Sequence, residues 1–369
     1  MVPSNGWRAG WSGRKPPGRS TETMSNPVLV EVTRGDLVES RHCGAIAVVD
    51  PHGRRVATVG DVEATVFPRS AVKPIQALPL VESGAADAYG FGAPELALAC
   101  ASHSGEPRHV ETAGAMLAAA GRSVADLECG THMPTSSVAE RALIRAGHPA
   151  SPLHNNCSGK HAGFICTACH LGLDPEGYVL PDHPVQREVT AALADLTATP
   201  IDAANRGVDG CSIPAYAVPL DRLARAFARM ATGEGLPPLR AAAAKRLLAA
   251  CMVEPFMVAG TGRFCSDVMP LFPGRLFVKT GAEGVYCAAV PELGLGVALK
   301  VDDGGTRAAE TAMAATIAAL LPEARTLGLP FDRWLKRPIM NHRRTVTGNV
   351  GPSAGLVDAL QAVPHGATG

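Results

Sequence analysis

The chain has 369 residues, and its 34 Lys and Arg residues balance 34 Asp and Glu residues, so the formal net charge is zero. This balance argues against binding to nucleic acid or to an anionic membrane, and an aromatic content of 4% leaves few rings for stacking on bases. No apolar run of about 18 residues occurs, so no transmembrane helix is predicted. The length is sufficient for a large core and about two domains of a soluble globular protein.

Residues 1–26 are rich in Gly, Pro, Ser and basic residues and lack the apolar stretch of a secretory signal. We therefore expect a disordered tail, with Met24 as the functional start, and a cytoplasmic protein. In a reducing compartment, the 10 cysteines should mostly be reduced core residues, and some of them are available as metal ligands.

Strand-like runs begin the ordered chain at 28–34, 44–50 and 54–60, and Pro-His-Gly joins the last two as in a hairpin. From about Ser70 to Ala250 the chain is rich in Ala and Leu with helical periodicity. Three strand-like runs follow at 275–281, 284–291 and 296–304. A helical segment at 306–321 and a final strand-like run at 343–350 come after them.

This order predicts an α/β (α+β) fold in which one antiparallel sheet is built from both chain ends and covered by helices, with an inserted helix-rich subdomain. We expect three parts in the chain. They are a tail at 1–26, a sheet domain at 27–69 and 251–369, and a helix-rich subdomain at 70–250 that carries the active-site loops.

The stretch FPRSAVKPIQALPL, residues 67–80, places Ser70, Lys73 and Pro74 at the start of an apolar segment. One interpretation makes Ser70 a helix N-cap and Lys73 a solvated charge. The other makes Ser70 a nucleophile and Lys73 its base. Because Pro74 must lie in the first helical turn, Ser70 is expected at a helix start, where free N–H groups favour an oxyanion.

A late strand ends in Lys279, Thr280 and Gly281. Together with Ser-x-x-Lys, this Lys-Thr-Gly matches the paired signatures of serine β-lactamases and penicillin-binding proteins. A lysine acts as a base only when neutral, and a second cation lowers its pKa. We expect Lys279 to be that cation for Lys73, Thr280 to bind substrate, and Gly281 to let substrate approach the strand closely.

Three polar loops complete the set of candidate site segments. CASHSGEPRH contains Ser102, which is either part of a capped loop or a proton relay between two lysines. HNNCSGKHAGF contains Cys157, Lys160 and His161, and RGVDGCSIPAY contains Asp209 and Cys211. Two cysteines from separate loops are suitable ligands for zinc, although no paired C-x-x-C spacing supports such a site.

Taken together, PRSAVKPIQALP, CASHSGEPRH, HNNCSGKHAGF, GVDGCSIPAY, GTGRFCSD and VKTGAEGVY resemble the Rhizobium etli type of L-asparaginases. The resemblance implies a fold similar to serine β-lactamases, penicillin-binding proteins and glutaminases. It also implies a homodimer that hydrolyses L-asparagine to L-aspartate and ammonia. By the same resemblance, two Ser-Lys tandems fall on Ser70 with Lys73 and on Ser102 with Lys279.

The resemblance further implies that Cys157, Lys160 and Cys211 bind zinc, with Asp209 either a fourth contact or a close neighbour. This zinc would organise the substrate pocket rather than activate water, and it would bind more weakly in acid because a lysine ligand must be neutral. The flanking Arg69 and His161 are candidates for binding the α-carboxylate and polar groups of the substrate.

We therefore expect an L-asparaginase that works through a Ser70 acyl-enzyme, with Lys73 as base and with Ser102 and Lys279 passing a proton to ammonia. Two alternatives stay open. One is a glutaminase or another Ser-Lys amidohydrolase or peptidase of the penicillin-binding type. The other is an inactive zinc-binding protein on the same fold.

Overall fold

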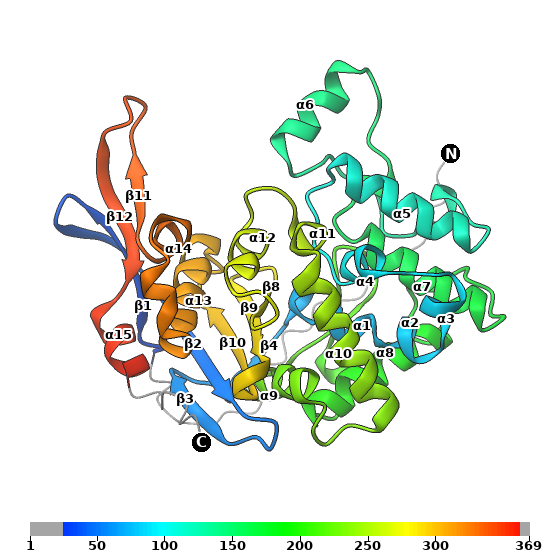
Figure 1. The fold of residues 1–369 in the computed structure, drawn as a ribbon, viewed down its shortest axis with the longest axis horizontal. Helices are drawn as coiled ribbons and strands as arrows, with labels where there is room; N and C mark the ends of the chain where they lie inside the picture. The colour runs from blue at the N-terminus through cyan, green and yellow to red at the C-terminus, as the bar shows by residue number, and fades with distance from the viewer. Residues whose placement is uncertain (1–24, 362–369) are drawn as a thin grey trace, which may run out of the picture.

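The computed structural model describes residues 25–361 (Figure 1). Residues 1–24 of the predicted tail therefore lie outside the described part of the chain. Within that part, no helix is long and apolar enough to cross a membrane.

The central sheet has eight strands, and every pairing between them is antiparallel. Its main path runs β11-β12-β1-β2-β10-β9-β8, and β3 pairs with β2. The strands are β1 (Val28–Arg34), β2 (Leu37–Val49), β3 (Arg55–Val59), β8 (Phe277–Thr280), β9 (Val285–Val290), β10 (Leu295–Val301), β11 (Arg337–Met340) and β12 (Val346–Pro352). Because β2 pairs with β10, the two ends of the chain form one sheet, and the predicted antiparallel sheet is confirmed.

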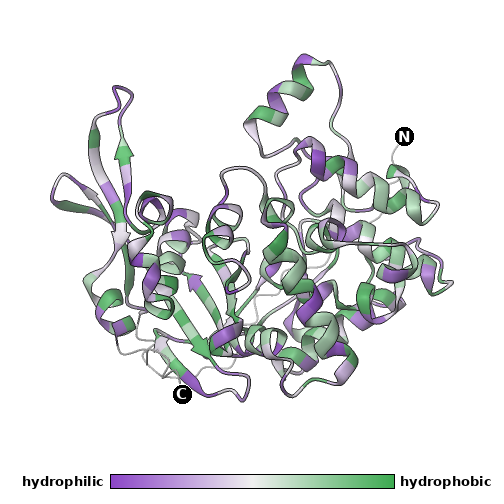
Figure 2. Cartoon of the chain, viewed as in Figure 1, coloured by the Kyte–Doolittle hydropathy of each residue, from purple (hydrophilic) through white to green (hydrophobic). Residues whose placement is uncertain are grey.

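Helices cover both faces of this sheet. Helix α9 (Leu220–Thr232) packs on β2, β9 and β10, and α13 (Thr306–Leu320) packs on β1, β9, β10 and β12. Every residue of β9 is buried, which requires cover on each side. The central strands accordingly read as continuous apolar runs instead of alternating ones, and Figure 2 shows the apolar colour along them.

The remaining helices lie mostly beside the sheet in Figure 1. They are α1 (Lys73–Gln76), α2 (Leu78–Glu82), α3 (Ala85–Ala88), α4 (Ala93–Ala99), α5 (Pro107–Ala119), α6 (Ser137–Arg145), α7 (Ser158–His170), α8 (Pro184–Thr197), α10 (Pro238–Val253), α11 (Pro255–Ala259), α12 (Phe264–Val268), α14 (Leu329–Leu335) and α15 (Ala354–Gln361). Two short sheets pair β4 (Thr65–Val66) with β7 (Val218–Pro219) and β5 (Arg206–Val208) with β6 (Pro214–Tyr216). The domain boundaries predicted near residues 70 and 250 stay a prediction.

The apolar segment after Ser70 forms three short helices instead of one continuous helix. Pro79 lies at the start of α2, where its missing N–H does no harm but where the preceding helix has to end. Gly84 separates α2 from α3 in the left-handed region at φ 84°.

Candidate active site

Ser70 lies in a single 3-10 turn, Arg69–Val72, which packs against β8 and β9. This turn leads directly into α1 at Lys73, and no side chain caps either element. The interpretation of Ser70 as an N-cap is therefore wrong. Arg69, immediately before Ser70, adopts φ 51° in the left-handed region, an uncommon conformation for a residue with a side chain.

Gly281 allows the Ser70 turn to approach the end of β8. A Cβ built on Gly281 would lie 2.6 Å from the carbonyl oxygen of Pro68. The structure therefore gives this glycine a packing role against the turn, whereas sequence analysis assigned it to close approach of the substrate. Thr280, which is buried, donates its hydroxyl hydrogen bond to the Gly281 carbonyl at 3.0 Å.

Two buried lysines meet at the Ser102 hydroxyl. Lys73 Nζ lies 3.1 Å and Lys279 Nζ lies 2.8 Å from Ser102 Oγ. Lys73 also donates to the Ala101 and Asn156 carbonyls, and Lys279 donates to the Thr280 carbonyl. The structure thus places Ser102 between the lysines. Within residues 25–361, no hydrogen bond joins the Ser70 hydroxyl to Lys73.

The charge state of this cluster depends on Lys279. Burial and, next, the charge of Lys73 lower the pKa of Lys279 to about 7. A large fraction of Lys279 is therefore neutral at neutral pH and able to accept a proton. Sequence analysis assigned Lys279 both as the cation that lowers the pKa of Lys73 and as part of a proton relay, and its lowered pKa favours the second of these roles.

A second buried cluster joins the start of α7 to the loop between β5 and β6. Lys160 Nζ donates to Cys211 Sγ at 3.1 Å. A hydrogen bond from Cys211, together with the charges of Lys73 and Lys160, lowers the pKa of Cys157 well below its usual value. Burial lowers the pKa of Lys160, but the two cysteines and Asp209 outweigh burial and raise it overall.

Close packing fixes the backbone that carries this second cluster. Gly159 lies in the first turn of α7 beside α4, and a Cβ there would come within 2.4 Å of the Leu98 side chain. Any larger residue would push α7 away from α4. Glycine therefore sets the position of the neighbouring Lys160, a role that the polar motif alone does not reveal.

The donor set of the second cluster fits zinc. Cys211 is hydrogen-bonded to both Lys160 and Cys157, all three are buried, and thiolates suit this soft divalent ion. In the described part of the chain, no group of three or more His, Cys, Asp or Glu side chains is arranged to hold a metal. A zinc site here would accordingly depend on Lys160 as its third ligand.

Asp209 lies beside this cluster and pairs with Arg69. Its carboxylate accepts hydrogen bonds from Arg69 Nη2 at 3.0 Å and Nε at 3.3 Å. Burial raises the pKa of Asp209, but Arg69 and Lys160 outweigh it and leave that pKa below its usual value. This pairing favours a neighbouring position for Asp209 over direct ligation, and it connects the Ser70 turn to the Cys211 loop.

His161 has one ring nitrogen bonded and one free. Tyr178, which sequence analysis did not single out, accepts a hydrogen bond from the Glu128 amide at 2.8 Å. The Tyr178 hydroxyl lies 2.7 Å from His161 Nδ1. Because this hydroxyl already accepts one bond and has one hydrogen to donate, we assign that hydrogen to Nδ1 and the proton of the neutral ring to Nε2. This buried Nε2 has no hydrogen-bond partner among residues 25–361.

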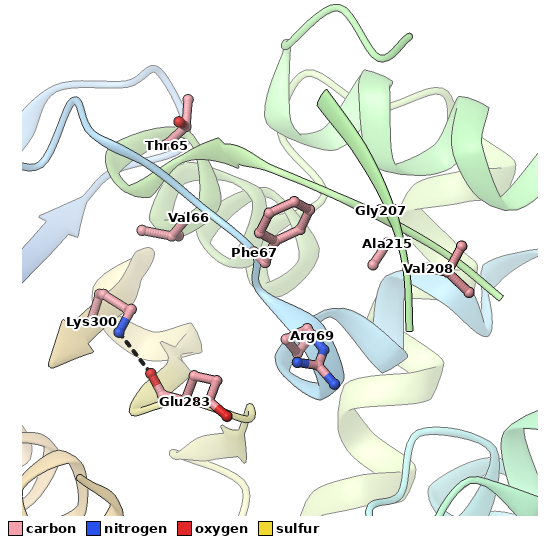
Figure 3. A pocket seen from close by; sticks show the side chains of 9 residues that line it. All are labelled: Thr65, Val66, Phe67, Arg69, Gly207, Val208, Ala215, Glu283 and Lys300. Atoms are coloured by element: carbon pink, nitrogen blue, oxygen red, sulfur yellow. Dashed lines mark hydrogen bonds between the residues drawn. The ribbon is translucent and has the colours of Figure 1, made fainter. Parts of the chain in front are cut away.

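A cavity of about 470 Å³ lies next to Arg69 (Figure 3). Arg69 is the only predicted site residue in its lining, and the aromatic ring of Phe67 borders the same space. The lining consists of Thr65, Val66, Phe67, Arg69, Gly207, Val208, Ala215, Glu283 and Lys300. Arg69, which directly precedes Ser70, therefore connects this cavity to the Ser70 turn.

The structure is a mixed α/β fold with a buried cluster of one serine and two lysines, and comparison with known families shows which family the chain belongs to. The L-asparaginase II family model matches residues 30–352, and the chain belongs to this family. The resemblance to L-asparaginases seen in the motifs is therefore confirmed. Among curated protein sequences, none matches the chain significantly.

Several solved structures are distantly similar to the chain. Mglu is 17% identical, with a TM-score of 0.32 over 72% of this chain and 64% of that one. Mglu in its tris and glutamate form is 16% identical, with a TM-score of 0.34 over 79% of this chain and 62% of that one. A β-lactamase from Mycobacterium bovis is 15% identical, with a TM-score of 0.33 over 74% of this chain and 94% of that one. The chain thus spans less than two thirds of the length of Mglu.

Proposed function

We propose that the protein is an L-asparaginase that hydrolyses L-asparagine to L-aspartate and ammonia through an acyl-enzyme on Ser70. The observation that carries this proposal is the buried hydrogen-bonded row of Lys73, Ser102 and Lys279 beside the Ser70 turn. Such a row can move a proton between a serine nucleophile and a neutral amine, which is what amide hydrolysis through a serine requires.

The first step activates Ser70. Neutral Lys279 accepts the Ser102 proton, Ser102 accepts one from Lys73, and Lys73 accepts the proton of Ser70. The net result is one proton transferred from Ser70 to Lys279. The Ser70–Lys73 contact must shorten when substrate binds, and such tightening is common because catalytic hydrogen bonds are often long in a free enzyme.

The next steps follow from the same relay. The Ser70 oxygen attacks the side-chain amide carbon of asparagine, and backbone N–H groups of the Ser70 turn stabilise the oxyanion. As the C–N bond breaks, the relay returns its proton to the departing nitrogen, and ammonia leaves. Water then attacks the aspartyl ester with the relay as base, which releases aspartate and restores Ser70.

Arg69 and His161 are the proposed substrate-binding residues. The guanidinium of Arg69 is oriented by Asp209 at the edge of the cavity. The unpartnered Nε2–H of His161 is a donor, so it suits an acceptor such as the α-carboxylate of asparagine. Leaving such a donor unpaired while buried costs about 1–3 kcal/mol, which supports a ligand or water as its partner.

Zinc is proposed as a structural part of the site. Cys157, Lys160 and Cys211 would hold it, and its charge would tie the Cys211 loop to the start of α7. The side chains of this turn, including His161, would then be fixed for substrate binding. The proposal also includes a homodimer in the cytoplasm, and light scattering on purified protein would measure the assembly.

Two assays test the function. The first measures ammonia release from asparagine and from glutamine, and the second treats the protein with a β-lactam. We expect release from asparagine with a clearly higher kcat/KM than from glutamine. Equal or greater kcat/KM with glutamine would make the protein a glutaminase. Inhibition by covalent attachment of the β-lactam to Ser70 would favour a peptidase of the penicillin-binding type. Bound zinc without any hydrolysis would favour the inactive binding protein.

A further inference from the structure

His103 is a fully buried side chain that follows Ser102 directly and contacts the start of α7. Its Nδ1 accepts a hydrogen bond from the Gly105 amide at 3.1 Å. In the neutral ring the proton must therefore be on Nε2, which lies 2.9 Å from Ser158 Oγ. The Ser158 hydroxyl in turn donates to the Leu153 carbonyl at 2.9 Å. Each donor in this series of hydrogen bonds thus has one acceptor.

The start of α7 also contacts the row of Lys73, Ser102 and Lys279. The His103 amide donates to the Asn156 carbonyl at 3.3 Å, and Lys73 Nζ donates to this same carbonyl at 3.3 Å. On the other side, the Ser102 amide donates to the Val258 carbonyl at 3.0 Å. The position of the Ser102 turn relative to Lys73 is therefore set by its attachment to the segment that begins α7.

The surroundings of His103 keep its ring neutral and immobile. Its ring stacks on His109 at 4.9 Å, and His109 stacks on Phe256 at 4.6 Å. Burial is the largest cause that lowers the pKa of His103 well below its usual value, and electrostatic repulsion from His109 and Lys73 adds to it. His109 is equally buried, but its bonds go to the Glu106 amide and the Phe256 carbonyl and not to Ser158.

We propose that His103 is a positioning residue whose Nε2–H bond to Ser158 holds the Ser102 hydroxyl between Lys73 and Lys279. The inference rests on the proposed function for its assay, because it assigns Ser102 to the proton relay. A relay of three groups depends on two short contacts at once. A displacement of about 1 Å at a reacting group can cost about 100-fold in rate, so loss of this single bond is expected to affect turnover.

Steady-state kinetics with L-asparagine tests the proposal in variants that separate the two ring nitrogens. His103→Asn keeps an acceptor near the Nδ1 position and loses the donor to Ser158, whereas His103→Gln keeps a donor near the Nε2 position. We expect His103→Asn and Ser158→Ala to lower kcat about 10- to 100-fold while KM stays within about threefold of wild type. His103→Gln should recover most of the lost kcat.

The matched control is His109→Asn, which disturbs the same aromatic stack without touching the Ser158 bond. We expect its kcat per folded molecule to stay within about threefold of wild type, even if its melting temperature falls. In the His103→Asn/Ser158→Ala double variant, kcat should fall no further than in either single variant, because both remove one bond. Equal kcat losses in His103→Asn and His109→Asn, or an unchanged kcat in Ser158→Ala, would overturn the positioning role.

These outcomes are distinct from failure of the proposed function. Wild-type protein that releases no ammonia from asparagine would overturn the function. The rate at which a fluorophosphonate labels Ser70 would then provide the same comparison among variants. Labelling that is equally fast in wild type and His103→Asn would overturn the positioning role independently of the substrate.

Discussion

Lys279 and Lys160 are both almost completely buried, at 0% and 2% exposure, yet their pKa values move in opposite directions. Lys279 faces a hydroxyl, a carbonyl and the positive charge of Lys73, and the opposing effects of Cys265 and Cys157 are too weak to compensate for burial of its charge. Lys160 faces Cys211, Cys157 and Asp209, and these groups outweigh the burial of its charge. Burial alone therefore does not decide whether a lysine is charged, because the neighbouring charges can outweigh it.

The difference distinguishes the cluster proposed to transfer protons from the cluster proposed to hold zinc. Lys73 links the two, because its charge lowers the pKa of Lys279 and also that of Cys157. The lowered pKa of Lys279 allows it to accept a proton, whereas the raised pKa of Lys160 keeps it positively charged beside the cysteines. The variants below remove one side of this comparison at a time.

The largest effect is expected for Ser70→Ala, which removes the nucleophile that both clusters would serve. Ammonia release should fall by at least about 10³-fold, since the relay has no substitute oxygen to activate. The change in unfolding free energy should be below about 1 kcal/mol, because no cap or buried hydrogen bond is lost. A variant that keeps more than a few per cent of wild-type kcat would show that Ser70 is not the nucleophile.

Lys279→Met removes the proton acceptor and leaves Lys160 untouched. We expect kcat to fall about 10²- to 10³-fold, within the range of general base catalysis. The control is Lys160→Met, which should raise KM more than it lowers kcat. Steady-state kinetics measures both variants. Equal changes in kcat and in KM for Lys279→Met and Lys160→Met would contradict the comparison.

Metal removal acts on the Lys160 side of the comparison. Chelation, or Cys157→Ser, should raise KM about tenfold with a smaller fall in kcat, because the zinc would support substrate binding rather than the chemical step. Elemental analysis of purified wild-type protein should find about one zinc per chain. That zinc should be lost in Cys211→Ser. Full occupancy in a Cys157→Ser/Cys211→Ser double variant would place the metal elsewhere.

The pH dependence of kcat/KM tests the coupling between Lys73 and Lys279. Lys279 is an ammonium below its pKa and a base above it, so wild-type activity should rise as pH increases through about 7. In Lys73→Met the positive charge that lowers this pKa is gone, and the midpoint of the residual activity should move to higher pH. If kcat/KM of Lys73→Met were lower at every pH but had the same midpoint as wild type, the charge of Lys73 would not lower the pKa of Lys279.

Much of the sheet could be predicted because its strands carry uninterrupted β-branched and apolar runs bounded by turn residues. Strand β11 was missed, since its four residues include Pro338 and carry no periodicity. The three short helices after Ser70 could not be told apart, because helical periodicity continues across Pro79 and Gly84 whereas the helices end there.

The site residues could be proposed from motifs, but their contacts could not. Ser102 and Lys279 lie 177 positions apart, and spacing cannot tell that this hydroxyl reaches both lysines. The same holds for Tyr178 and His103, whose roles come from bonds to residues in other segments. Which lysine has the lowered pKa depends on burial and on the charges around it, and these exist only in the folded protein.

The most direct test of opposite charge states is an NMR titration of the lysine side chains in metal-free protein. Carbon-13 at the ε position reports protonation, and Lys279→Met and Lys160→Met identify the two signals. The Lys279 signal should titrate with a midpoint near pH 7, while Lys160 should stay protonated beyond the usual lysine range. A Lys279 midpoint in the ordinary range above pH 10, or a Lys160 signal that titrates together with it, would contradict the account.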